Sequence, residues 1–351
     1  MLLFRVNLVV KLTLLVSVCY LVFNSIQYVQ STCRRIKIPF FHPDKAAVKT
    51  KDASGALSHP ELVMKRMVEK AARSSGDSNT VLVTTANFAY LDLFENLVGS
   101  VRHADPELVN MVLVIAEEAK AYSYLKEHHP DAVLPYNAEL QGPTDALSFQ
   151  SKSYKRIVSQ RPGYLLELIQ HNVTVLYQDT DTVWVKNPLP YLEKYAEVRN
   201  GEMLITPDAH PNYYMSKEDR LKLNTDIATQ CHGGYCCSCF LYLRPTLKVR
   251  EFLTAWRDSV KTPDLLQWKM NKVLKDMLGQ LRYRVLPPDL FPNGMFFFNW
   301  GYFNRSGIQQ PLVVHSNFIV GHKGKVSRFQ RHNLWFLPTV NDTNASSPLS
   351  S

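Results

Sequence analysis

The chain has 351 residues, 46% of them hydrophobic, which is enough to bury a large core and excludes a chain that is disordered throughout. Its formal net charge is +9 at pH 7, but the Lys and Arg residues are spread along the whole sequence. No helix-turn-helix, RRM or zinc-finger pattern accompanies them, so we expect no nucleic acid among the partners.

An apolar run, LTLLVSVCYLVF, lies close to the start of the sequence at residues 12–23. Together with residues 24–29 it reaches the ~17–25 residues that a helix needs to cross a bilayer. No small-x-small cleavage site follows it, so residues 1–30 are expected to be a cytoplasmic tail and a signal anchor of a single-pass type II protein. A cleaved signal peptide is the alternative, and both place the remaining chain in the secretory lumen.

Two further features agree with a luminal location. N-x-S/T sequons, which accept N-linked glycans, occur at Asn172, Asn304, Asn341 and Asn344. Four of the six cysteines form a cluster, namely Cys231, Cys236, Cys237 and Cys239. We expect one or two structural disulfides there, as is usual in an oxidising compartment. A zinc site is the alternative, although the cluster has no second, distant cysteine pair.

Residues 31–78 are polar and irregular apart from a helical patch at residues 61–73, and they predict a stem. From Val81 onward, short apolar runs alternate with segments of helical spacing, which is typical of βαβ units and a parallel sheet. Strands are expected at 81–85, 111–116, 173–177, 203–206, 239–244, 282–287 and 312–316. Helices are expected at 163–171, 246–260 and 265–281. The sequence thus predicts one α/β domain over residues 79–337 and a flexible tail over residues 338–351.

The third of these strands leads directly into Asp179-Thr180-Asp181. Ligands of α/β sheets bind at the carboxyl ends of the strands. Two carboxylates one residue apart can reach a single divalent cation, and such a cation can bridge a diphosphate. We therefore expect Asp179 and Asp181 to hold a metal that stabilises a departing nucleoside diphosphate. A solvated turn is the alternative for this short motif.

A second group of polar residues follows the last predicted strand. His315 is expected to be a third metal ligand through its neutral imidazole, with a purely structural histidine as the alternative. Lys323 and Lys325 follow Gly321, where the backbone can approach a phosphate closely. These lysines could contact a diphosphate or form a solvated basic turn, and the sequence does not choose between the two. Lys323 is a cofactor-binding candidate.

The segment SQRPGYLLELIQHNVTVLYQDTDTVWVKNPLPYL, residues 159–192, resembles the core of the family-77 glycosyltransferases, especially the plant rhamnogalacturonan-II alpha-1,3-xylosyltransferases. Four more segments match in the same order: TTANFAYLDL (84–93), CCSCFLYLRPT (236–246), LFPNGMFFF (290–298) and VVHSNFIVGHKGKVSRFQRHNLW (313–335). The resemblance covers residues 80–337, and the collinear order makes it far more specific than any one motif.

This resemblance implies a GT-A-type nucleotide-diphospho-sugar transferase fold with a mixed, mostly parallel sheet. It implies a UDP-sugar donor, a bound Mn²⁺ or another divalent cation, and retention of the anomeric configuration. The metal ligands that it implies are Asp179, Asp181 and His315. The turn that would hold uridine and ribose consists of Thr85, Ala86 and Asn87.

Three more residues receive roles from the resemblance. Arg161 matches a basic residue that suits the donor diphosphate, with a solvated arginine at a helix start as the alternative. Asp208 matches an acid on the active-site side of the sheet, and Asp208 and Gln267 are the catalytic candidates. One departure concerns Leu266, which stands where the family has an acid next to the glutamine.

The expected function is transfer of a sugar, xylose from UDP-xylose first, onto a hydroxyl of a glycan or glycoprotein acceptor, with fucose as an acceptor sugar. The alternatives are a UDP-galactose-dependent galactosyltransferase and a glycan-binding protein of the same fold without turnover, which Leu266 would favour. The expected location is the Golgi membrane, with the endoplasmic reticulum as the alternative. The sequence does not predict an oligomeric state.

Overall fold

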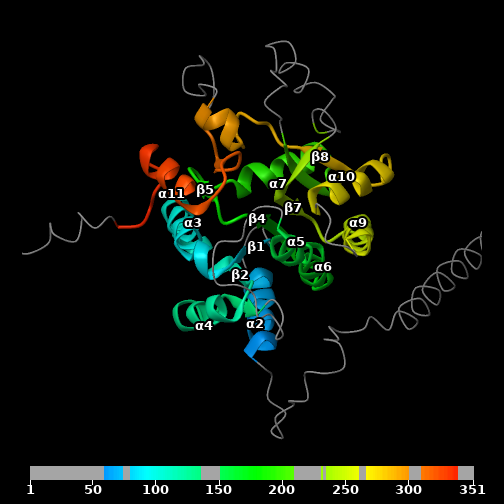
Figure 1. Cartoon of the computed structure of the whole chain (residues 1–351). Helices are drawn as coiled ribbons and strands as arrows, with labels where there is room; N and C mark the ends of the chain where they lie inside the picture. The colour runs from blue at the N-terminus through cyan, green and yellow to red at the C-terminus, as the bar shows by residue number, and fades with distance from the viewer. Residues whose placement is uncertain are drawn as a thin grey trace, which may run out of the picture. The chain divides into compact units, whose positions relative to one another are not determined.

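The computed structural model describes residues 59–73, 80–135, 151–208, 231, 235–260, 266–299 and 310–338, all of them within one compact unit over residues 51–351 (Figure 1). None of the helices in these ranges has the length and apolar character needed to cross a bilayer. The predicted signal anchor, most of the predicted stem and residues 339–351 lie outside the described residues.

The helical patch in the predicted stem is the helix α2, His59–Arg73. Its buried side chains are Val63, Met67 and Ala71, which recur every fourth residue and so lie on one face. These side chains belong to the main hydrophobic core, and α2 contacts the strands β1 and β3. This helix therefore packs on the folded domain, whose start the sequence had placed at residue 79.

Within the described residues, a seven-stranded sheet has the order β3-β2-β1-β4-β7-β6-β8. The strands are β1 (Thr80–Ala86), β2 (Val112–Ala116), β3 (Val133–Pro135), β4 (Thr174–Gln178), β6 (Met203–Pro207), β7 (Cys236–Leu243) and β8 (Tyr283–Val285). The strands β3, β2, β1 and β4 run parallel, β7 is antiparallel to both of its neighbours, and β8 is parallel to β6. The expected mixed, mostly parallel sheet is confirmed, and β4 is its central strand.

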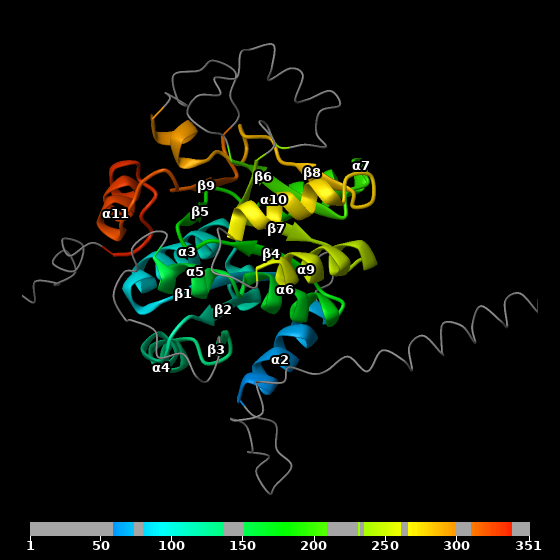
Figure 2. The ribbon, with the colours of Figure 1, turned by 45° about the vertical axis from the view of Figure 1, so that its right-hand side comes forward.

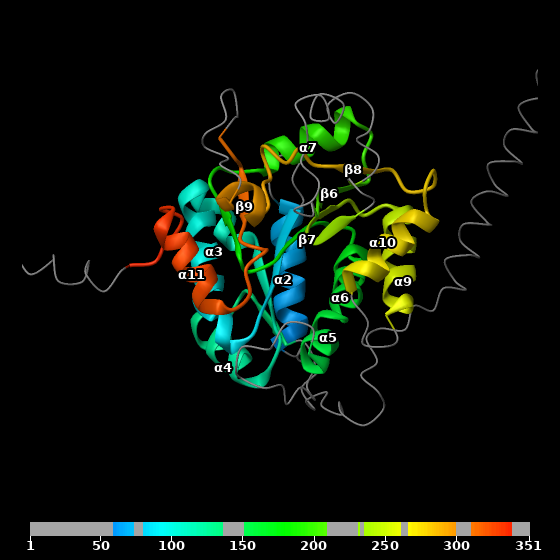
Figure 3. The same ribbon diagram turned by 45° about the horizontal axis from the view of Figure 1, so that its top comes forward.

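Helices cover both faces of this sheet, so β1, β2 and β4 are buried almost throughout and read as continuous apolar runs. In Figure 3, α3 and α11 lie on one side of the strands, and α6, α9 and α10 lie on the other. The helices are α3 (Leu91–Ala104), α4 (Ala119–His128), α5 (Lys152–Val158), α6 (Arg161–Gln170), α7 (Leu189–Val198), α9 (Leu247–Ser259), α10 (Leu266–Asp276) and α11 (His322–Arg331). Short 3₁₀ turns occupy Phe88–Tyr90 and Pro106–Met111.

A separate two-stranded sheet joins β5 (Thr182–Trp184) to β9 (Val313–His315) in antiparallel register, with Thr182 opposite His315. Figure 2 shows this pair between the main sheet and α11. A second, smaller hydrophobic cluster holds it against α3, α11 and the π-helical turn Met295–Asn299. The buried members of this cluster are Leu93, Val183, Phe296, Phe297, Val314, Phe329 and Leu334. The late part of the chain is thereby fixed beside the end of β4.

Candidate active site

The central strand β4 places the two predicted aspartates at the carboxyl edge of the sheet. The backbone N–H of Asp179 donates to the Cys239 carbonyl of β7 at 2.9 Å, which extends the strand pairing by one residue. The Thr182 N–H and hydroxyl then both donate to the Asp179 carbonyl, at 3.1 and 2.8 Å. This closed turn brings Asp181 back beside Asp179.

The β5–β9 pairing brings the third predicted ligand to the same place. Opposite the start of β5, the Ser316 N–H donates to the Asp181 carbonyl at 2.8 Å. His315 Nε2 lies 3.2 Å from Asp181 Oδ1, and both side chains are mostly buried. Ligand atoms of Asp179, Asp181 and His315 all lie within 4.8 Å of one another. Two carboxylates and one imidazole at this spacing fit a divalent cation.

Each aspartate also has a cationic partner. Arg161 Nη2 donates to Asp179 Oδ1 at 2.9 Å, and Lys325 Nζ donates to Asp181 Oδ2. Burial would raise the pKa of Asp181, but Lys325 and His315 outweigh it and hold that pKa well below its ordinary value. The site thus combines two carboxylates with two fixed positive charges, an arrangement that can bind a cation and an anion together.

Arg161 is buried, which excludes the solvated arginine that the sequence left open. It begins α6, and its Nη1 donates to the Ser238 carbonyl at 2.8 Å and to the Ser238 hydroxyl at 3.0 Å. Its guanidinium lies 4.5 Å from the Tyr177 ring centroid. Burial opposes its charge, but the Asp179 carboxylate outweighs burial and raises the pKa of Arg161. This arginine is held rigidly and carries its charge at every physiological pH.

The turn after β1 has the expected residues at the edge of the sheet. Ala86 and Asn87 are buried, and Asn87 Oδ1 has no hydrogen-bond partner among the described residues. A buried acceptor without a partner is rare in folded proteins, and an N–H or O–H group of a bound ligand would satisfy it. The structure therefore fits the implied role of this turn in holding a nucleoside.

Sequence reasoning missed Glu117, which follows β2 beside the same turn. Its backbone N–H donates to the Ala86 carbonyl at 2.9 Å, and its side chain is hydrogen-bonded to Thr85. Burial raises the pKa of Glu117 to about 7. Its neighbour Glu118 instead caps α4, accepting from the Lys120 and Ala121 N–H groups. The sequence signal that could have identified Glu117 is its position directly after a buried strand. The same rule identified Asp179.

Asp208 and Gln267 are brought together from β6 and α10. Gln267 Nε2 donates to Asp208 Oδ2, and Gln267 Oε1 accepts from the Ser238 N–H at 3.1 Å. Because Ser238 also holds Arg161, hydrogen bonds connect the two catalytic candidates with the aspartate pair. Leu266 is buried in the core, with its carbonyl accepting from the Trp256 indole at 3.1 Å. The residue that replaces the family acid is therefore part of the hydrophobic core.

The two lysines near the start of α11 have different surroundings. Lys323 is exposed, whereas the Lys325 side chain is mostly buried and also donates to the Ser316 carbonyl at 3.0 Å. Gly321 precedes the helix with a φ of 89°, a value that favours glycine. The structure brings Lys325, and not Lys323, to the aspartates.

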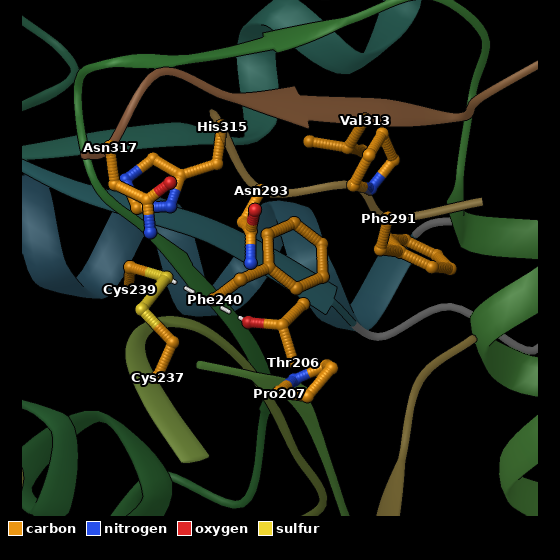
Figure 4. Close-up of a pocket in the computed structure, with 11 residues that line it drawn as sticks. Thr206, Pro207, Cys237, Cys239, Phe240, Phe291, Asn293, Val313, His315 and Asn317 are labelled. Atoms are coloured by element: carbon orange, nitrogen blue, oxygen red, sulfur yellow. Dashed lines mark hydrogen bonds between the residues drawn. A yellow bond between two sulfur atoms is a disulfide. The ribbon is translucent and has the colours of Figure 1, made fainter. Parts of the chain in front are cut away.

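The four clustered cysteines pair as Cys231–Cys236 and Cys237–Cys239, so the expected disulfides are present. The second disulfide lines a small pocket next to His315 (Figure 4). The opposite wall comes from two of the matched segments, which contact each other closely. The Gly294 N–H donates to Asn317 Oδ1 at 2.6 Å, and a Cβ on Gly294 would lie 2.2 Å from the Asn317 carbonyl oxygen. Only glycine fits at this contact.

The fold and the site define a class of enzyme that transfers sugars from nucleotide-diphosphate donors. The profile of the family described as "Nucleotide-diphospho-sugar transferase" matches residues 107–329, and the chain belongs to this family. The resemblance noted in the sequence is thereby confirmed.

Two curated proteins show the range of relatives. The chain is 28% identical over 294 residues to the UDP-D-xylose:L-fucose alpha-1,3-D-xylosyltransferase of Arabidopsis thaliana, covering 80% of this chain and 75% of that protein. It is also 28% identical over 208 residues to the UDP-galactose:fucoside alpha-3-galactosyltransferase of Dictyostelium discoideum, covering 55% of this chain and 30% of that protein. Among solved structures, the galactosyltransferase LgtC is 12% identical with a TM-score of 0.43, covering 75% of this chain and 99% of that one.

Proposed function

We propose that this enzyme transfers xylose from UDP-xylose to a hydroxyl of a fucose residue in a luminal glycan, with retention of the anomeric configuration. The observation that carries this proposal is the convergence of Asp179, Asp181 and His315 at the end of the central strand, with Arg161 and Lys325 beside them.

Asp179, Asp181 and His315 would hold a divalent cation, Mn²⁺ first, which when bound stabilises the negative charge of the leaving diphosphate. Arg161 and Lys325 come from the two sides of this set and add fixed positive charge without any proton transfer. Such groups, already oriented in a partly dry site, stabilise developing charge better than water does.

The nucleoside would occupy the turn of Thr85, Ala86 and Asn87, where Asn87 Oδ1 offers an unused acceptor. Glu117 lies against the same turn and can donate or accept a hydrogen bond, because its pKa of about 7 makes both protonation states accessible.

Asp208 would face the sugar or the acceptor. Its hydrogen bond from Gln267 fixes the carboxylate and leaves it partly exposed at the edge of the sheet. Retention requires a carboxylate that attacks the anomeric carbon or an acceptor that attacks from the face that the diphosphate leaves, and Asp208 is the residue to test for the first path.

The choice of xylose and fucose rests on relatives, several of which carry the name UDP-D-xylose:L-fucose alpha-1,3-D-xylosyltransferase and match 80% of this chain. Galactose is the second candidate, because a fucoside alpha-3-galactosyltransferase is also similar. The names of both relatives include fucose or a fucoside, so they agree on the acceptor sugar and differ in the donor sugar.

The proposed compartment is the Golgi lumen, with a type II anchor in the membrane. The apolar run at residues 12–23 and the four sequons support it. The two disulfides agree with an oxidising compartment.

The test is a transfer assay with the detergent-purified full-length chain, methyl fucoside as acceptor, and UDP-xylose, UDP-galactose or UDP-glucose as donor. We expect transfer from UDP-xylose that EDTA abolishes and Mn²⁺ restores, and an alpha-linked product by NMR. Faster transfer from UDP-galactose would replace the donor assignment. A protein that binds fucosides without releasing UDP from any donor would overturn the proposed reaction.

A further inference from the structure

Cys237 and Cys239 lie beside the metal ligands rather than in a remote structural element. As positions i and i+2 of the extended strand β7, they point to the same side of the sheet, with Cα atoms 5.3 Å apart. The carbonyl of Cys239 accepts the backbone N–H of Asp179. Both cysteines are buried, yet both line the pocket next to His315.

His315 belongs to two sets of metal-ligating atoms at once. A ring nitrogen of His315 and carboxylate oxygens of Asp179 and Asp181 all lie within 4.8 Å of one another. A ring nitrogen of His315 and the sulfur atoms of Cys237 and Cys239 also lie within 4.8 Å of one another. Figure 4 shows His315 above the disulfide, with the pocket between them and Thr206. Thr206 Oγ1 lies 3.7 Å from Cys239 Sγ.

We propose that reduction of the Cys237–Cys239 disulfide creates a second metal site, made of Cys237, Cys239 and His315, for a thiophilic divalent cation such as Zn²⁺. Two thiolates and an imidazole are ligands that Zn²⁺ prefers, with water in the fourth position. The aspartate pair prefers harder cations. The two sites differ in the metal that they select and share one histidine.

The redox step balances with a thiol reductant. Two reductant thiols give two electrons to the Sγ–Sγ bond, which breaks, and the reductant becomes a disulfide while its two protons pass to Cys237 and Cys239. Zn²⁺ then displaces these two protons to solvent when it binds the two thiolates.

The consequence for catalysis rests on the proposed function. His315 Nε2 lies 3.2 Å from Asp181 Oδ1, so a cation that takes the imidazole toward the sulfur atoms removes a ligand from the aspartate site. Zn²⁺ is therefore expected to inhibit transfer by the reduced chain and to leave the oxidised chain active in the presence of Mn²⁺.

The test uses the full-length chain with Co²⁺ as a spectroscopic probe, because a thiolate–Co²⁺ charge-transfer band cannot arise at the aspartate site. The reductant is a phosphine, which gives two electrons to the disulfide and becomes the phosphine oxide, with its oxygen atom coming from water. Unlike a thiol reductant, it offers no sulfur ligand to the metal. We expect the band in the reduced chain, its absence in the oxidised chain, and its loss when Zn²⁺ is added.

Variants assign the ligands. C237S/C239S should lose the band, H315A should bind Co²⁺ about tenfold or more weakly, and the matched control C231S/C236S should keep the band. No band in the reduced wild-type chain, or a band that persists in C237S/C239S, would overturn the site. Circular dichroism reports whether each variant folds.

If C237S/C239S does not fold, alkylation of the reduced wild-type chain decides. Zn²⁺ should slow the labelling of Cys237 and Cys239 by iodoacetamide and leave the labelling rates of Cys231 and Cys236 unchanged, and an equal effect of Zn²⁺ on all four, or none, would contradict the proposal. The band is read on the reduced chain, and transfer is measured on the oxidised chain with Mn²⁺. A band with no transfer by the oxidised chain would count against the proposed function alone, and transfer by the oxidised chain with no band in the reduced chain would count against this site alone.

Discussion

The two aspartates of the site are held by different parts of the molecule. Asp179 is fixed by the main sheet and α6, through Arg161, the Tyr177 hydroxyl at 2.7 Å and the Cys239 carbonyl. Asp181 is fixed by elements that come much later in the chain, through His315 of β9 and Lys325 of α11. The Asp179 side is continuous with the buried core, whereas the Asp181 side depends on the smaller cluster around β5 and β9. The Asp179 side holds Arg161, the proposed anion clamp, and the Asp181 side completes the proposed metal site.

The largest expected effect is on the Asp181 side. Asp181→Asn keeps the shape of the side chain but removes the charge that a divalent cation needs, so transfer should fall on the order of 10³-fold. Steady-state rates across a Mn²⁺ titration measure this loss. The control is Asp276→Asn, an exposed aspartate at the end of α10. Activity within a few-fold of wild type would remove Asp181 from the metal site.

The Asp179 side is tested by Arg161→Lys, which keeps a positive charge but loses the fork that reaches both Ser238 and Asp179. We expect kcat/KM for the nucleotide sugar to fall about 10²-fold. Arg102→Lys, at an exposed position of α3, is the matched control. If Arg161→Lys behaves like that control, the clamp does not act on the donor.

Glu117, at the edge of the sheet beside β1 and β2, predicts a pH dependence of the free energy of unfolding. Its folded-state pKa of about 7 lies above the ordinary value of 4.5, so the unfolded chain loses the proton first as the pH rises. The free energy of unfolding should therefore fall between pH 4.5 and 7, and Glu117→Gln should remove this fall, gaining about 3 kcal/mol at pH 8 and nothing at pH 4.

Urea unfolding of Glu117→Gln at both pH values measures this difference, with the exposed Glu127→Gln as control. An equal gain at pH 4 and pH 8 would show that the carboxylate is not the cause.

The smallest expected effect separates the two lysines of α11. Lys325→Met should lower kcat/KM about tenfold, because it removes one charge from a site that retains Arg161. Lys323→Met should lower it less, since Lys323 is exposed. The same assay with Lys275→Met, an exposed lysine of α10, sets the baseline. A larger loss for Lys323→Met would reverse the assignment of these lysines.

Local patterns predicted the Asp179 side well. Continuous apolar runs identify buried parallel strands, and the carboxyl end of such a run identified Asp179 and Asp181 without any relative. The same rule would have found Glu117. Burial of Arg161 could not be predicted, because it depends on Ser238 of β7, which lies 77 residues further along the chain.

The Asp181 side was less accessible to sequence reasoning. His315 was proposed from its place at the end of a predicted strand and from the resemblance, but the β5–β9 pairing that explains its position involves two strands of only three residues each. No helix was predicted at α11. Lys323 and Lys325 lie two positions apart in this helix and so face different directions, which is why choosing between them needed the helix itself.

The β5–β9 pairing has a consequence for synthesis of the enzyme. Lys325 and Asp181 are 144 residues apart, and His315 also comes from the later stretch. A nascent chain can complete β1, β2 and β4 and display both aspartates long before the ribosome reaches β9. A premature stop codon between β5 and β9 would thus yield a product that keeps Asp179-Thr180-Asp181 but lacks both His315 and Lys325, the two partners of Asp181.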